Sequence, residues 1–132
     1  MKMLSNEVQF YSVGTTGTSA AITTPVVDMS GFENILFVGI LSASNASCTL
    51  KMQMGTASGS LTSTTGSVAG TVKNLYLDVN RPTQRYVAGV LKGTTTTGAY
   101  RTLLAIPYGA RSKPTSNDAS ATGIRSYSPA TG

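Results

Sequence analysis

The amino-acid sequence predicts an all-β protein, an antiparallel β-sandwich or jelly roll with extended N- and C-terminal arms. Three observations support this prediction. Apolar residues almost never recur with the helical period, β-branched and small polar residues dominate, and Gly- or Thr-rich clusters interrupt the chain about every ten residues. Short alternating segments between such clusters are typical of sheets that bury one face.

Two neighbouring segments give the clearest strand predictions. Residues 34–41 form a continuous apolar run, which predicts a central strand that is buried on both faces. Residues 47–54 alternate between apolar and polar side chains, which predicts a half-buried strand. The side chains expected to face inward there are those of Cys48, Leu50, Met52 and Met54. Residues 42–46 have a suitable length for a hairpin loop between the two strands.

The second half of the chain predicts a three-stranded antiparallel meander. Its strands are expected at 74–80, 85–92 and 99–108, with turns at 81–84 and 93–98. Asp78 and Arg85 would then face each other around the first turn and pair across it. Pro107 lacks an amide hydrogen and is therefore expected at a strand end or on a sheet edge.

Weaker signals complete the expected domain. Residues 8–13 and 25–28 predict two short strands, and the Gly-, Ser- and Thr-rich residues 55–72 predict a long surface loop with at most one short strand. We interpret residues 1–108 as one β-sandwich domain, with residues 1–6 as an N-terminal arm. Residues 109–132 have no periodic apolar face, so we expect an extended C-terminal arm that a neighbouring subunit orders.

The composition excludes several classes of function. The chain has no His and a single Cys, so it offers no Ser-His-Asp or Cys-His catalytic system, no Cys/His zinc site and no internal disulfide. It shows no nucleotide-binding glycine motif, no apolar run long enough to span a membrane and no signal-peptide pattern. We therefore expect a protein that is not an enzyme, without catalytic residues, metal or cofactor, and without a membrane partner.

Charge is sparse and uneven along the chain. Charged residues make up 11% of the sequence, against about 25% in an ordinary domain. The net charge of +5 combines −1 over residues 1–72 with +6 over residues 73–132. The basic residues are spread singly, without interleaved stacking aromatics, so no specific nucleic-acid partner is expected. The basic half suits solubility and local ion pairs or, alternatively, an acidic protein surface.

Arg, Lys and Tyr side chains around the turn at 81–84 and after the last strand are the best candidates for a partner interface. Arg and Tyr are among the residue types enriched at protein interfaces. The candidate interface residues are Arg81, Arg85, Tyr86, Tyr108, Arg111, Lys113, Arg125 and Tyr127. The alternative interpretation is that these side chains only solvate the surface.

Short motifs in the same region resemble a known family. Residues 75–87 read LYLDVNRPTQRYV, residues 104–114 read LAIPYGARSKP, and residues 28–33, before the continuous apolar run, read DMSGFE. Taken in their order along the chain, these segments resemble a family of small virion proteins of tailed bacteriophages. The usual pattern of that family is Leu-Asp-Val-x-(Lys/Arg)-Pro-x-x-Arg-Tyr-Val, then an apolar strand ending in Tyr-Gly-x-Arg-x-(Lys/Arg)-Pro. The resemblance covers residues 25–117.

The resemblance implies a capsid decoration (cement) protein, which bridges and stabilises coat subunits on the outside of the phage head. The implied partners are the major capsid protein and copies of the chain itself, as a homotrimer or another homo-oligomer. The implied location is the virion, with assembly in the host cytoplasm. Two alternatives stay open: another virion component (major coat, head-fibre or tail protein), or a jelly-roll module that binds carbohydrate or nucleic acid.

Overall fold

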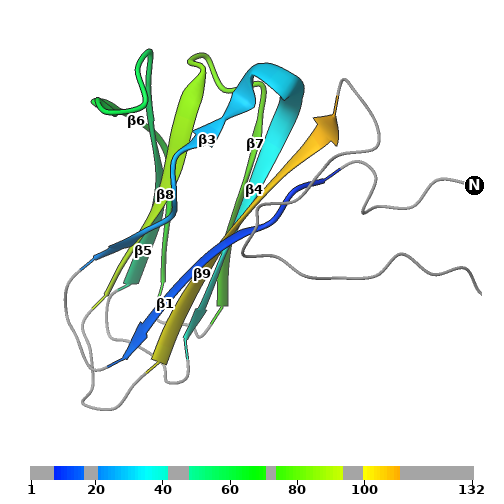
Figure 1. Cartoon of the computed structure of the whole chain (residues 1–132). Helices are drawn as coiled ribbons and strands as arrows, with labels where there is room; N and C mark the ends of the chain where they lie inside the picture. Colours follow the sequence, from blue (N-terminus) through cyan, green and yellow to red (C-terminus); the bar gives the residue numbers. More distant parts are fainter. Residues whose placement is uncertain (1–7, 17–20, 42–47, 71–73, 94–99, 111–132) are drawn as a thin grey trace, which may run out of the picture.

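The computed structural model describes residues 8–16, 21–41, 48–70, 74–93 and 100–110, which form two β-sheets packed against each other (Figure 1). The first half contains β1 (Tyr11–Thr16), β2 (Ile22–Thr23), β3 (Val27–Asp28), the short 3₁₀ helix η2 (Met29–Gly31) and β4 (Phe32–Leu41). The second half contains β5 (Cys48–Gly55), β6 (Ser63–Gly70), β7 (Asn74–Asn80), β8 (Tyr86–Gly93) and β9 (Tyr100–Ala110). Within these ranges no helix has the length and apolarity that crossing a membrane requires.

The strand order identifies a jelly roll. Sheet A has the order β1-β9-β4-β7, and sheet B has the order β2-β8-β5-β6, with β3 also paired to β8. Because β2 and β3 pair with different parts of β8, they act as one interrupted strand. Most consecutive strands then belong to opposite sheets, which is the wiring of a jelly roll. The prediction of an all-β sandwich or jelly roll is confirmed.

The predicted pairing of consecutive strands is wrong in two places. β4 lies in sheet A and β5 in sheet B, so they do not form the hairpin expected around residues 42–46, which are outside the described residues. β7, β8 and β9 do not form a meander, because β8 belongs to sheet B while both its chain neighbours belong to sheet A. Alternation shows which side chains face the core, and facing sheets satisfy that requirement as well as a hairpin does.

The segment expected to be mainly a loop contains a full strand. β6 pairs with β5 along its length and lies at the edge of sheet B. Its sequence, STTGSVAG, has few apolar side chains, but backbone hydrogen bonds to one neighbour and the strand preference of Thr are sufficient at an edge.

The core lies between the inner faces of the two sheets. β5 buries Cys48, Leu50, Met52 and Met54, as its alternating sequence predicts. Phe37 of β4 packs against β8 at Gly89, where an added Cβ would lie 2.5 Å from a carbon of the Phe37 ring. Only glycine leaves room for this contact, so these two residues set how closely the sheets approach.

β4 is a central strand, but only one of its faces is buried. The side chains that face the core include those of Ile35, Phe37 and Leu41. On the outer face Leu36 and Val38 are half-buried, and Ile40 is 42% exposed. The prediction that residues 34–41 are buried on both faces is therefore wrong. The sandwich has only two layers, so each sheet covers one face of the other and leaves its own outer face uncovered.

β9 extends past its predicted end. It ends at Ala110 rather than at residue 108, and Pro107 is buried within it, near its C-terminal end. The Gln9 N–H, just before β1, donates to the Pro107 carbonyl oxygen at 3.1 Å, and Ile35 of β4 lies on the other side, so Pro107 is neither at a strand end nor on a sheet edge as predicted. Residues 1–6 and 111–132 are outside the described residues, so the two arms stay predictions.

Candidate interface

One end of the sandwich brings together segments that are far apart in the sequence. The link 81–85 crosses there from β7 in sheet A to β8 in sheet B. The Arg81 N–H donates to the Glu33 carbonyl oxygen at 2.8 Å, which joins the link to β4. Ala110 pairs with Phe32, so β9 ends at the same place. We call this region, residues 28–34, 80–86 and 108–110, the linker end.

Arg81 adopts an unusual backbone conformation. Its φ of 50° lies in the left-handed region, which residues with a Cβ rarely enter. The hydrogen bond to Glu33 holds the backbone in place. The side chain is exposed, and its guanidinium has no ion pair among the residues that the structure describes. Arg81 is therefore available to a partner that carries negative charge.

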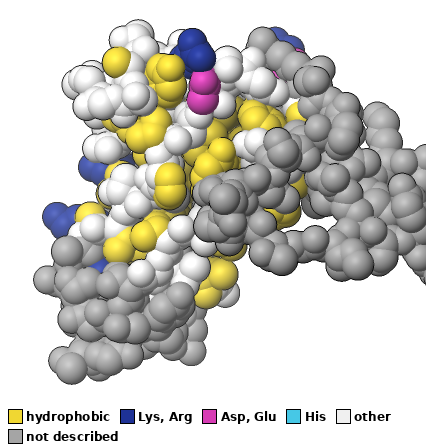
Figure 2. Space-filling view, viewed as in Figure 1, with side chains coloured by type: hydrophobic (Ala, Val, Ile, Leu, Met, Phe, Trp, Pro, Cys, Tyr) yellow, Lys and Arg dark blue, Asp and Glu magenta, His cyan; other side chains and the backbone are white. Residues whose placement is uncertain are grey.

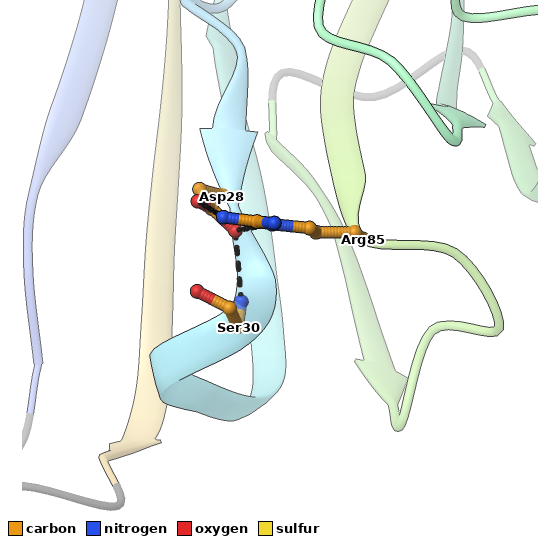
Figure 3. A network of polar contacts seen from close by, with 3 residues as sticks. All are labelled: Asp28, Ser30 and Arg85. Carbon is orange, nitrogen blue, oxygen red and sulfur yellow. Dashed lines mark hydrogen bonds and ion pairs between the residues drawn. The ribbon is translucent and has the colours of Figure 1, made fainter.

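Arg85 is instead engaged within the protein (Figure 3). Its guanidinium donates from Nε to Asp28 Oδ1 at 2.9 Å and from Nη2 to Asp28 Oδ2 at 2.8 Å. Asp28 also caps η2, since its Oδ1 accepts from the Ser30 N–H at 3.0 Å. The Arg85 carbonyl oxygen accepts from the Met29 N–H at 2.8 Å, and the guanidinium lies 5.1 Å from the centre of the Tyr86 ring. These contacts fix the link against β3.

The electrostatics of this pair follow from its geometry. The two hydrogen bonds from Arg85 hold the pKa of the Asp28 carboxyl well below its usual range, and the Ser30 N–H acts in the same direction. Asp28 in turn raises the pKa of Arg85 further. Both side chains are about half exposed, so water and salt weaken the attraction. The pair positions the linker end more than it stabilises the fold.

A surface pocket of about 620 Å³ lies at the linker end. Residues 81–85 line one part of it, and Met29, Ser30, Phe32 and Glu33 line the rest. The lining combines the Arg81 guanidinium, which has no ion pair with another described residue, with the Glu33 carboxylate, small hydroxyl groups and apolar surface. Among the described residues, no group of three or more His, Cys, Asp or Glu side chains could hold a metal ion.

Tyr108 lies at the linker end but on the outer face of sheet A. Its hydroxyl donates to Asp78 Oδ1 at 2.6 Å. β4 lies between β9 and β7, so this bond crosses over β4. The bond to the Asp78 carboxylate, with some burial, raises the pKa of Tyr108 to about 12.

The structure brings together some of the predicted interface residues and not others. Arg81, Arg85 and Tyr86 lie together on the link and the start of β8, and Tyr108 lies nearby on sheet A. The expected Asp78–Arg85 pair is wrong, because the link changes sheet and Arg85 reaches Asp28 instead. The remaining predicted positions are outside the described residues; they are Arg111, Lys113, Arg125 and Tyr127.

Sequence reasoning missed the role of Asp28. An Asp two residues before a Ser, at the start of a short turn, is a recognisable capping signal. Its ion-pair partner is 57 positions away, and no local pattern indicates such a pairing. The end of the sandwich could therefore be predicted only in part.

The outer faces of the two sheets differ in character. On sheet B the outward side chains of β5 are Thr49, Lys51 and Gln53, and Lys92 of β8 lies opposite Thr49. On sheet A apolar side chains cover the middle of β4 and β9 and extend to β7, where Tyr76 is 72% exposed. Figure 2 has the view of Figure 1, which shows the two sheets from the side and not the outer face of sheet A; in it hydrophobic side chains gather in the middle of the described surface and basic ones lie along its margins. An exposed apolar sheet face of this kind marks a candidate interaction surface.

Comparison with known proteins shows likeness in fold. No protein-family model and no curated protein matches the sequence. A structure from the disulfide-linked pili formed by Bacillus endospore appendages is similar, with 12% identity, a TM-score of 0.50, and coverage of 78% of this chain and 87% of that chain. The PBSX exported protein XepA is similar with 13% identity and a TM-score of 0.57. That match covers 96% of this chain but 46% of XepA, so the chain spans less than half the length of that protein.

Proposed function

We propose that this chain is a non-enzymatic structural protein of a bacteriophage virion, and specifically a decoration protein that binds coat subunits on the head. The observation that carries the proposal is the convergence of the three motif segments at the linker end. DMSGFE, LYLDVNRPTQRYV and the start of the YGARSKP segment are distant in sequence, yet Asp28 bonds to Arg85, Glu33 to Arg81, and Phe32 pairs with Ala110.

The contacts at the linker end suggest separate tasks for its residues. Arg85 and Asp28 hold the link in position, while Arg81 presents an exposed guanidinium to the partner. Arg111 and Lys113 follow β9 directly in sequence and lie outside the residues that the structure describes. A coat surface with carboxylates at matching positions would bind at the linker end, and repetition over the head would multiply weak single contacts.

The similarity in fold is consistent with this proposal. One similar structure is the PBSX exported protein XepA, and the other comes from the disulfide-linked pili of Bacillus endospore appendages. A jelly roll with a rigid core and without a metal-ligand cluster in its described part suits a structural role.

Copy number tests the proposal. Phage particles purified from a lysate in which the chain is made are quantified by mass spectrometry against the major coat protein. A decoration protein is expected at a copy number comparable to that of the coat. A few copies per particle would replace it with a head-fibre or tail role, and absence from the particles would exclude a virion protein altogether.

A charge reversal tests the docking end. Arg81→Glu is expected to reduce occupancy on heads that lack the protein by about 10-fold, since the guanidinium contact becomes a repulsion. Lys92→Glu makes the same change in net charge on the outer face of sheet B and is the matched control. Equal occupancy for the two variants would show that the linker end does not face the coat.

A further inference from the structure

The outer face of sheet A presents a regular grid of side chains over β7, β4 and β9. Directly opposed residues on antiparallel strands point to the same side of a sheet. The register defines four rows on this face, of which the one nearest the linker end is Asn80–Asn34–Tyr108. The other three run Asp78–Leu36–Ile106, Tyr76–Val38–Leu104 and Asn74–Ile40–Thr102. We call these nine residues the outer grid. Ile40 is 42% exposed and Tyr76 is 72% exposed, while Leu36, Val38, Leu104 and Ile106 are half-buried.

The first and third rows of the outer grid match in their central apolar residue and carry complementary polar groups on β7. The first row is acidic, apolar and apolar, and the third row is an amide, apolar and a threonine. A two-fold axis along the middle row would place Asp78 opposite Asn74 of a second copy and Leu36 opposite its Ile40. Val38 would face Val38 of the second copy. Such mutual matching of one patch with itself is what a two-fold interface requires.

We propose that two copies of this chain pack face to face through the outer grid, with the two-fold axis along the middle row. The Asn74 amide then donates to the Asp78 carboxylate of the other copy, beside the bond that Asp78 already accepts from Tyr108. An axis along β4 would instead place the Asp78 carboxylate over Ile106, where no donor replaces water. The side-chain pattern therefore favours the first of these two arrangements.

Charge also favours a second copy on this face. The chain carries a net charge of +5, so two copies repel each other in most orientations. The outer grid contains no Lys or Arg, whereas the outer face of sheet B carries Lys51 and Lys92. Of the two outer sheet faces, that of sheet A is thus the one on which two copies repel each other less.

The size of the grid sets the expected affinity. Three strands about 4.8 Å apart and five residues of each strand correspond, with side chains, to roughly 400 Å² on each copy. A stable interface buries about 800 Å² on each partner. The pairing is therefore expected to be weak in solution, with a dissociation constant in the micromolar range or above.

Sedimentation equilibrium over a range of protein concentrations tests the pairing. We expect a monomer–dimer equilibrium, and we expect Tyr76→Ser to abolish it without unfolding, because that side chain is largely exposed. Asn74→Lys should strengthen the dimer and Asn74→Asp should weaken it, by roughly 2- to 10-fold each, since Asp78 of the other copy faces this position twice per dimer. Gln53→Lys and Gln53→Glu on sheet B are the controls for net charge.

Each result of these experiments either supports or overturns the face-to-face dimer. A monomer at every concentration would overturn the proposal, as would a dimer that Tyr76→Ser leaves intact. Equal effects of Asn74→Lys and Asn74→Asp would overturn the proposed axis. A trimer mass would replace two-fold pairing with the threefold assembly that the phage resemblance implies.

Discussion

Asp28 and Arg85 form a two-point ion pair that ties β3 to the link between the two sheets. The carboxylate oxygens lie 2.9 and 2.8 Å from the guanidinium nitrogens, and the same carboxylate caps η2. The pair closes a loop of 57 positions in sequence at the linker end. It holds the link, which carries Arg81 and lines the pocket, against β3.

Removing the Asp28 charge should have a modest effect on stability. We expect Asp28→Asn to lower the thermal unfolding midpoint by about 2–4 °C at pH 7, since the pair is half exposed and its attraction is screened. Calorimetry measures the change. Glu33→Gln removes an exposed carboxylate at the same end and should have no comparable effect. An equal loss in both variants would show that net charge rather than the pair is responsible.

Acid should remove the same contribution. The folded-state pKa of Asp28 lies below its ordinary value of 3.8, so the pair stabilises the fold above that pH. Its contribution is lost as the pH falls through 3.8 toward the lower folded-state value. The difference in unfolding midpoint between the natural chain and Asp28→Asn should therefore shrink on acidification. A difference that grows between pH 4 and pH 2 would contradict this account.

Tyr108 should lose its proton at a higher pH than a free tyrosine does. Its pKa is raised from 10.0 to about 12 because the neutral hydroxyl donates to Asp78, so this bond stabilises the fold below pH 10 and is lost as the pH rises toward 12. Ultraviolet titration of the six tyrosines should show a component near pH 12 that Tyr108→Phe removes. Asp78→Asn should move that component back toward 10, and a component unchanged in both variants would refute the assignment.

Which side of a strand faces the core could be predicted from the sequence, but which strands lie side by side could not. The alternation of Leu50 and Met52 with polar residues is confirmed by their complete burial. Which strand lies beside β5 depends on long-range contacts, and the short connection from β4 suggested a hairpin where the chain changes sheet. Loop length alone does not distinguish the two arrangements.

At the candidate interface, too, the sequence indicated the residues but not their contacts. Arg81 and Arg85 were singled out by residue type and by their place at a turn, but only the fold shows that Arg85 is engaged by Asp28. The apolar outer face was missed because a continuous apolar run is typical of a strand covered on both sides. The outward Val38 and Ile40 instead belong to the exposed surface of a two-layer sandwich.

The backbone of Arg81 yields a further prediction. With φ at 50°, glycine should be tolerated there, since it enters the left-handed region without the steric cost that a Cβ carries. We expect Arg81→Gly to be between neutral and about 1 kcal/mol more stable than the natural chain in urea unfolding. Arg81→Ala keeps the Cβ and should bring no such gain. A clear and similar destabilisation by both variants would show that the side chain, not the backbone, holds the link.

The contact between Gly89 and Phe37 should be the least tolerant point of the core. A Cβ at position 89 would lie 2.5 Å from a ring carbon of Phe37, so Gly89→Ala must displace the ring or part the sheets. We expect a loss of about 1–3 kcal/mol in the free energy of unfolding, measured in urea. Gly31→Ala is the matched control, because a Cβ there meets nothing within 4 Å and its effect should stay within about 0.5 kcal/mol. In a Phe37→Leu background Gly89→Ala should cost less, and an unchanged cost in that background would mean that the two residues do not set the distance between the sheets.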